Sequence, residues 1–261
     1  MGKVLILGAG YGTRLQRDLK ASPEHAHLLG IPKALLPLGG RDALITHWLD
    51  LFRDHGIDVY VVTNAACYDL FVAWAKRHDL PTDHIVSDGT LSNETRLGAV
   101  PDIAFGIHHF NLEQEDVLVV GGDTLFLKDF SLKDYLAQAS SQQDTCLVTT
   151  YRVSDDQVHK FGIVETDDQG IMTSFLEKPD PSSTPSRLAC PCFYLFAPNS
   201  LPLLDEFIDS CQGQPKEVFD ATGKFLAYLY PRFTVKTYPI SGRIDVGGLQ
   251  SYLDADKYFT N

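Results

Sequence analysis

The sequence predicts an α/β protein with a three-layer, Rossmann-like fold, in which helices cover both faces of a central mixed, mostly parallel sheet. Short apolar stretches alternate with helical patterns through the first half of the chain, and this β-α-β order produces parallel strands. The 261 residues are 44% hydrophobic and 21% charged, which is enough for a sizeable core. We therefore expect a single domain spanning residues 1–261, with a smaller lobe inserted after Asp123.

The elements of the first half follow from the spacing of apolar residues. The run Val4–Leu7 predicts a buried strand, which we expect to be followed by a long loop to about Gly40. Apolar residues recur with helical spacing over Leu44–His55, which predicts a helix. The next predicted elements are a strand at Asp58–Thr63, a helix at Tyr68–His78, a strand at His84–Ser87, a helix at Arg96–His109 and a strand at Asp116–Val120.

The second half has a different pattern. Phe161–Glu165 and Met172–Leu176 flank a turn that contains Gly170, which predicts a hairpin in the smaller lobe. The remaining predicted elements are strands at Thr145–Arg152, Leu188–Phe196 and Phe233–Tyr238, and helices at Leu201–Cys211, Lys216–Leu229 and Leu249–Phe259.

Charge and composition limit the classes of partner. The net charge of −12 argues against a nucleic acid or an acidic membrane surface as partner. The sequence has no run of 18 apolar residues, so we expect no transmembrane helix. The five cysteines stand mostly in apolar surroundings, which is typical of reduced thiols in a cytoplasmic protein. The sequence leaves open whether the protein forms a homo-oligomer.

A glycine-rich turn follows the first strand. Gly8, Gly10 and Gly12 stand at alternate positions and precede Thr13 and Arg14. Glycine lets the backbone bend and approach a ligand closely, and successive amides form an anion-binding concavity. The arginine fork suits phosphate oxygens. The turn matches neither the dinucleotide fingerprint, because Thr13 takes the place of the third glycine, nor the P-loop. Taken alone, it also fits a tight strand–helix connection.

Four more segments carry charge near predicted strand ends. Lys33 stands between two prolines, Asp123 and Asp245 each follow an apolar strand, and Glu177 and Lys178 follow the hairpin. Because ligands of open α/β sheets bind beyond the carboxyl ends of the strands, we expect these residues to meet in one site. Each also has a purely structural explanation, as a loop cation, a turn-forming or capping aspartate, or a surface ion pair.

Together these segments resemble the sugar nucleotidyltransferases, also called nucleotide-sugar pyrophosphorylases, and in particular the glucose-1-phosphate thymidylyl-, uridylyl- and cytidylyltransferases. The resemblance covers nearly the whole chain, in the order found in the family. The segments that carry it are Gly10–Leu15, Pro32–Lys33 with Leu35–Pro37, Gly122–Asp123, Phe161–Val164, Glu177–Pro179 and Asp245–Gly247.

The resemblance implies Mg²⁺-dependent transfer of a nucleotidyl group from a nucleoside triphosphate to a sugar 1-phosphate, with release of pyrophosphate. Arg14, Lys33 and Asp123 are then the expected catalytic residues. Asp123 and Asp245 are the expected metal ligands, because hard carboxylate oxygens suit Mg²⁺. The two reactants are both anions, so positioning and charge neutralisation supply most of the catalysis.

The resemblance also divides the chain into a nucleotide-binding half, residues 1–125, and a sugar-phosphate-binding half, residues 126–261. In the second half, Lys178 would hold the phosphate of the sugar, Glu177 would accept hydrogen bonds from its hydroxyls, and Gly162 would line the same pocket. The implied nucleotide-binding residues are Leu7, Gly8, Ala9, Gly10, Gly12, Thr13, Arg14, Lys33, Asn93, Thr95, Gly98 and Asp123.

Some features leave alternatives open. Asn93 and Thr95 are the expected base readers, but Glu94 and Arg96 bring charge into a turn that the family usually keeps neutral, so the base stays open. Residues 17–30 could form a lid. The acceptor could instead be a phosphorylated alcohol such as phosphocholine. A non-catalytic regulatory subunit that binds a nucleotide or sugar phosphate is a further alternative, which the retention of both acids disfavours.

Overall fold

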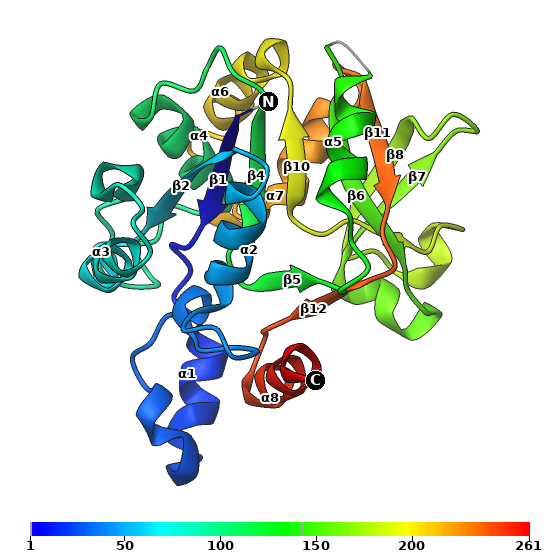
Figure 1. Cartoon of the computed structure of the whole chain (residues 1–261). Helices are drawn as coiled ribbons and strands as arrows, with labels where there is room; N and C mark the ends of the chain where they lie inside the picture. Colours follow the sequence, from blue (N-terminus) through cyan, green and yellow to red (C-terminus); the bar gives the residue numbers. More distant parts are fainter. Residues whose placement is uncertain (1, 142–143) are drawn as a thin grey trace.

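The computed structural model describes residues 2–141 and 144–261 (Figure 1). Its strands are β1 (Lys3–Leu7), β2 (Asp58–Thr63), β3 (Ile85–Ser87), β4 (Val117–Gly121), β5 (Thr124–Phe126), β6 (Cys146–Arg152), β7 (Gly162–Thr166), β8 (Met172–Glu177), β9 (Leu188–Ala189), β10 (Phe193–Phe196), β11 (Val235–Pro239) and β12 (Arg243–Asp245). Its α-helices are α1 (Thr13–Lys20), α2 (Leu44–Arg53), α3 (Tyr68–Arg77), α4 (Ala99–His109), α5 (Leu132–Ser140), α6 (Pro202–Ser210), α7 (Thr222–Leu229) and α8 (Leu249–Thr260).

The main sheet has the order β3-β2-β1-β4-β10-β6-β9-β7-β8, with β11 paired to β6. The strands of the first half, β3, β2, β1 and β4, are all parallel, whereas β10 runs antiparallel to both β4 and β6. The strand order reverses direction at β1, which lies between β2 and β4. Such a switch point leaves a crevice at the carboxyl ends of the strands, where ligands bind.

Helices cover both faces of the sheet, as the sequence predicts (Figure 1). The alternation of side chains along β1 shows why: Val4 and Ile6 pack into the core beneath α2, α3 and α5, whereas Leu5 packs into the core beneath α4, α6 and α7. All three side chains are fully buried. A strand buried on both faces reads as a continuous apolar run, which explains the uninterrupted pattern at Val4–Leu7.

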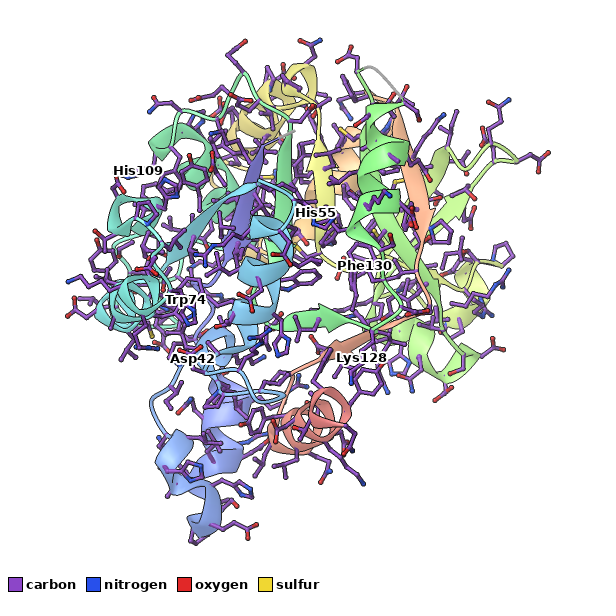
Figure 2. All side chains as sticks on the ribbon, in the orientation of Figure 1. Asp42, His55, Trp74, His109, Lys128 and Phe130 are labelled. Carbon is purple, nitrogen blue, oxygen red and sulfur yellow. The ribbon has the colours of Figure 1, made fainter. Side chains whose placement is uncertain are left out.

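An aromatic cluster holds β5 in place. The rings of Trp48, Phe126 and Phe193 lie 4.8–5.4 Å apart between centroids, and Phe130 joins them at the base of α5 (Figure 2). Trp48 also donates a hydrogen bond from Nε1 to the carbonyl oxygen of Thr124, at 2.8 Å. The cluster therefore fixes the segment that directly follows Asp123.

The segment β12–α8 returns to helix α1 through a small second sheet. Strand β12 pairs antiparallel with β5, so that Asp245 stands opposite Thr124. Helix α8 then packs beside α1, and the backbone amide of Leu249 donates to the carboxylate of Asp18 at 3.3 Å. This pairing brings residues more than 100 positions apart to one end of the sheet.

Three predicted elements differ from the structure in kind or in number. The expected loop after β1 contains α1, a helix of eight residues whose only buried side chains are Leu15 and Leu19, too few for a clear apolar pattern. The strand predicted at Leu188–Phe196 is divided into β9 and β10 around Pro191, which cannot donate a ladder hydrogen bond. The helix predicted at Lys216–Leu229 is a short 3₁₀ turn followed by α7.

Within the described residues, no helix is both long and apolar enough to span a bilayer.

We expect Gly122→Ala to destabilise the fold, because the amide of Gly122 donates to the carbonyl oxygen of Leu7 at 3.0 Å and a Cβ would lie 2.6 Å from that same oxygen. The backbone of β1 and β4 would have to separate, with an expected loss of about 1–3 kcal/mol of unfolding free energy. Urea unfolding measures the loss. Gly2→Ala is the matched control, because no atom of the described residues beyond its chain neighbours lies within 4 Å of its added Cβ.

Candidate active site

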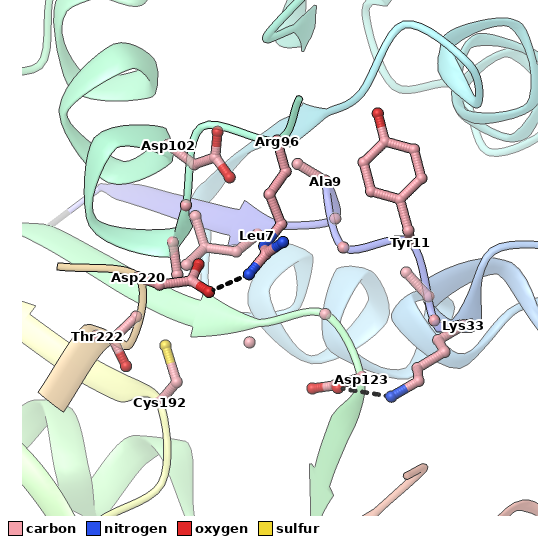
Figure 3. Close-up of a pocket in the computed structure, with 18 of the residues that line it drawn as sticks. Leu7, Ala9, Tyr11, Lys33, Arg96, Asp102, Asp123, Cys192, Asp220 and Thr222 are labelled. Carbon is pink, nitrogen blue, oxygen red and sulfur yellow. Dashed lines mark hydrogen bonds and ion pairs between the residues drawn. The ribbon is translucent and has the colours of Figure 1, made fainter. Parts of the chain in front are cut away.

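A cleft of about 340 Å³ lies at the carboxyl ends of β1 and β4, at the switch point of the sheet (Figure 3). The glycine-rich turn forms one wall, and the end of β4 forms the floor. Residues 93–102 and 220–222 close the opposite side. We call this the first cleft; the residues that line it are Leu7, Gly8, Ala9, Gly10, Tyr11, Gly12, Lys33, Ala34, Asn93, Arg96, Gly98, Ala99, Asp102, Gly121, Gly122, Asp123, Cys192, Asp220 and Thr222.

A second cleft of about 370 Å³ adjoins the first on the side of the hairpin β7–β8. Gly162, Glu177 and Lys178, the residues predicted for the acceptor, all line it. The two clefts share the residues Ala99, Asp123, Cys192 and Thr222. A ligand in one cleft therefore meets a ligand in the other beside the Asp123 carboxylate.

Asp123 lies against Lys33 at this boundary. The Nζ atom of Lys33 is 3.4 Å from Oδ2 of Asp123, and the lysine side chain is only 18% exposed, whereas the aspartate side chain is 43% exposed (Figure 3). The stem of Lys33 packs on Gly12, whose φ of +56° favours glycine and whose added Cβ would lie only 3.2 Å from Cγ of Lys33. The glycine turn therefore fixes the direction of the lysine.

Asp245 meets Asp123 through a shared neighbour. The hydroxyl of Thr124 lies 3.4 Å from Oδ1 of Asp123 and 3.2 Å from Oδ1 of Asp245. Arg243 donates from Nη1 to the same hydroxyl at 2.8 Å and to Asp245 at 3.1 Å. The two acids that the sequence singles out are thus neighbours at one end of the sheet.

This pair fits the ligand requirement of Mg²⁺, which takes one or two carboxylates and fills its other positions with water and phosphate oxygens. The side chains of Asp123 and Asp245 are 43% and 40% exposed, so their oxygens are accessible. In the described part of the chain there is no cluster of three or more His, Cys, Asp or Glu residues that could form an all-protein metal cage. The geometry suits a metal ion that takes its remaining ligands from a substrate and from water.

Nine of the predicted nucleotide-binding residues line the first cleft, and three do not. Arg14 is exposed and donates from Nε to the carbonyl oxygen of Gly247 at 2.7 Å, beside the segment that carries Asp245. Thr13 borders a separate hollow beside Arg17. Thr95 is exposed and donates to the carbonyl oxygen of Ser92. The nine residues that line the cleft are Leu7, Gly8, Ala9, Gly10, Gly12, Lys33, Asn93, Gly98 and Asp123.

Several polar residues of the first cleft were not predicted. Arg96 donates to Asp220 at 2.7 Å, on the side of the cleft opposite the glycine turn (Figure 3). The hydroxyl of Tyr11 lies 2.9 Å from that of Thr90, which links the glycine turn to the loop after β3. Asp102 is the residue that the sequence could have revealed, because it is an acid on the otherwise apolar buried face of α4.

Asp102 is 7% exposed, and its Oδ1 is buried without a hydrogen-bond donor among the described residues. Burial raises the pKa of Asp102 to about 8, and the nearby negative charge of Asp88 adds to the effect. The carboxyl group of Asp102 is therefore largely protonated at neutral pH. In the second cleft, burial also raises the pKa of Glu177, although Lys178 opposes this.

We expect Asp102→Asn to flatten the pH dependence of stability. Between pH 3.8 and about 8 the folded state holds a proton that the unfolded state has lost. Unfolding free energy therefore falls as pH rises through this window, by up to about 1.4 kcal/mol per pH unit from this group. Asparagine keeps the shape of the side chain and does not ionise. The unfolding free energy of the variant should therefore rise relative to that of the wild type as pH increases from 5 to 8.

Urea unfolding at pH 5, 6.5 and 8 measures this difference. Asp168→Asn, in the exposed hairpin turn, is the matched control and should leave the slope unchanged. A wild-type slope in Asp102→Asn would contradict the assignment of the buried proton.

The comparison with known proteins identifies the family. The family model described as "Nucleotidyl transferase" matches residues 3–261, so the chain belongs to the nucleotidyl transferase family. This confirms the resemblance that the sequence motifs indicated.

Two relatives show how far the similarity extends. Glucose-1-phosphate adenylyltransferase 1 of Vibrio vulnificus (strain YJ016) is 26% identical over 275 residues, which cover 96% of this chain and 64% of the relative. Glucose-1-phosphate adenylyltransferase of Histophilus somni (strain 2336) is 26% identical over 200 residues, which cover 70% of this chain and 42% of the relative. The chain therefore matches less than two thirds of the length of either relative.

Solved structures confirm the predicted fold class. A putative glucose-1-phosphate thymidylyltransferase from Bacillus anthracis, in complex with sucrose, superposes with a TM-score of 0.76 at 18% identity, covering 100% of this chain and 96% of that chain. A UDP-glucose pyrophosphorylase complexed with UDP-glucose gives a TM-score of 0.73 at 20% identity, covering 99% and 98%. At these identities the similarity establishes the fold.

Proposed function

We propose that this protein transfers a nucleotidyl group from a nucleoside triphosphate to a sugar 1-phosphate, giving a nucleotide sugar and pyrophosphate. The observation that carries the proposal is that two clefts of similar size meet at Asp123, with Lys33 and Asp245 close to the same carboxylate. A reaction between two phosphorylated molecules needs two adjoining anion sites and a way to offset their repulsion.

In this proposal the first cleft holds the nucleotide. The amides of the glycine turn and the ammonium group of Lys33 would contact the phosphates, and Asn93 and Gly98 would lie beside the base and ribose. Arg14 would supply positive charge to the phosphates from the side of the segment that carries Asp245, where its Nε donates to the Gly247 carbonyl. No protein nucleophile is required, because the phosphate of the acceptor attacks the α-phosphate directly.

Asp123 and Asp245 would hold Mg²⁺ in this site. When bound, the ion would offset negative charge on the phosphates of the two substrates. The chain's own residues would orient it: the Thr124 hydroxyl lies between the two acids, and Arg243 fixes one oxygen of Asp245.

The lining of the second cleft favours a sugar over phosphocholine as acceptor. The carboxylate of Glu177 accepts no hydrogen bond from the described residues, so it is available to sugar hydroxyls. The cations Lys160, Lys178 and Arg243 line the same cleft and outnumber its two carboxylates, Asp123 and Glu177, so the net charge of the lining disfavours a quaternary ammonium group. A neutral polyhydroxylated group fits these charges better.

A matrix of nucleoside triphosphates against sugar 1-phosphates and phosphocholine, scored by pyrophosphate release, tests the proposal. The matrix is run with Mg²⁺ and again with a chelator. We expect turnover with at least one sugar 1-phosphate and none when the metal is removed. Turnover with phosphocholine alone would favour the alcohol alternative, and nucleotide binding without turnover in any pair would favour a regulatory subunit.

A further inference from the structure

Arg243 is the most enclosed cation of the second cleft. Lys160 and Lys178 are exposed at the surface, whereas the side chain of Arg243 is only 13% exposed. The guanidinium carbon also lies 5.2 Å from the centre of the Phe161 ring, a cation–π contact with the residue that precedes β7. A long cation this well enclosed is already ordered before a ligand arrives.

Three contacts fix the guanidinium group of Arg243. Its Nη1 donates to the Thr124 hydroxyl at 2.8 Å and to Oδ1 of Asp245 at 3.1 Å. Its Nε donates to the hydroxyl of Tyr151 at 3.1 Å. These contacts come from β5, β6 and β12, so the group stands where the main sheet, the second sheet and the second cleft meet.

The second terminal nitrogen of the guanidinium group, Nη2, is not engaged by these contacts. Nη2 of Arg243 donates to no group in the described part of the chain, and it is not among the buried unpaired atoms, so its N–H groups are accessible. Arg243 lines the second cleft. Its Nη1 contacts the hydroxyl of Thr124, and that hydroxyl lies 3.4 Å from Oδ1 of Asp123, at the boundary with the first cleft. A free donor pair therefore lies close to the place where the two substrates must meet.

We propose that Arg243 binds the phosphate group of the acceptor through Nη2 and holds it next to Asp123 and Asp245. The planar fork suits a tetrahedral phosphate, and charge-assisted hydrogen bonds of this type are strong. Because Nη1 and Nε are already held, little side-chain entropy is lost when the phosphate binds. This inference rests on the proposed function, since it assigns the acceptor phosphate of that reaction.

The role proposed for Arg243 differs from the role expected of Lys178. Lys178 is exposed and has three rotatable donors on a flexible stem, so it supplies charge at the open side of the cleft. Arg243 supplies a fixed direction at the inner side. A phosphate held by both would be confined between the hairpin lobe and the two acids, oriented for attack on the α-phosphate.

Calorimetric titration with inorganic phosphate, without nucleotide or metal, tests the contact directly. The titration is made in a Lys33→Met background, which weakens phosphate binding at the glycine turn. We expect Arg243→Gln to weaken phosphate binding about 10- to 100-fold. Arg243→Lys, which keeps the charge beside Asp245, should weaken it severalfold, and provides the measurement if the glutamine variant does not fold. Lys133→Gln, on the exposed face of α5 and outside both clefts, is the matched control, with less than a twofold effect.

Steady-state kinetics separates phosphate binding from a purely structural role. With Lys33 intact, Arg243→Gln should raise the KM of the sugar 1-phosphate and leave the KM of the nucleotide nearly unchanged. Unchanged phosphate affinity in a folded Arg243 variant overturns the inference. So does a rise confined to the nucleotide KM, which would mean that Arg243 only positions Asp245. Phosphate binding that depends on Arg243 in a protein without turnover supports the contact and overturns the proposed reaction.

Discussion

Replacing Asp123 by alanine is expected to reduce turnover by at least about a thousand-fold while the protein stays folded. The carboxylate is the only acidic group that lines both clefts among the described residues, and it lies 3.4 Å from Lys33. Under the proposed function the change removes a metal ligand at the point where the two anions meet, which costs several kcal/mol of transition-state stabilisation, and about 4 kcal/mol corresponds to a thousand-fold. Pyrophosphate release with the best substrate pair measures the effect.

The structure also indicates why the fold should survive this change. The Asp123 side chain is 43% exposed, and the backbone around it is held by other contacts, such as the hydrogen bond from the Val246 amide to the Asp123 carbonyl. Asp168→Ala, in the exposed turn of the hairpin, should keep wild-type activity. Wild-type turnover in folded Asp123→Ala would remove the proposed metal site.

Lys33→Met is expected to lower kcat/KM for the nucleotide about 10- to 100-fold. The ammonium group is largely enclosed and aimed at the boundary of the two clefts by its packing on Gly12, so no other described cation of the first cleft can replace it from the same direction. A charge-assisted hydrogen bond to phosphate contributes about 1.5–3 kcal/mol, which sets this range.

The change in Lys33→Met should be seen in the nucleotide parameters, because the residue lines the first cleft and not the second. Initial rates with each substrate varied in turn separate the two. Lys76→Met, on the exposed face of α3, controls for loss of a positive charge. An effect confined to a higher KM for the sugar phosphate would contradict the assignment of Lys33 to the nucleotide in the first cleft.

Much of the fold could be predicted because its core segments have strong local patterns. Strand β1 is buried on both faces and reads as an unbroken apolar run, and α2 shows a regular apolar stripe. Helix α1 shows no such stripe, because it is short and buries only two side chains, so the sequence suggested a loop. Helix α5 was not predicted at all, although Leu132 and Tyr135 anchor it to the core.

The site was predictable where a motif fixes backbone geometry and not where side chains approach from distant segments. The glycine turn and Lys33 lie in one wall of the first cleft, as their spacing suggests. Arg96, Asp102 and Asp220 come together only because α4 and the start of α7 pack against each other, and no local pattern marks them as neighbours.

The sequence by itself determined the fold class and the family, and it singled out Asp123 and Asp245 as candidates, because apolar periodicity and short motifs depend on residues close together in the chain. Only the tertiary structure decided that Asp245 lies beside Asp123 through Thr124, that Arg14 turns toward Gly247, and that Arg243 offers a free donor pair to the second cleft. The physical reason is the pairing of β12 with β5: strand pairing across more than 100 residues sets side-chain direction, and local sequence does not encode it.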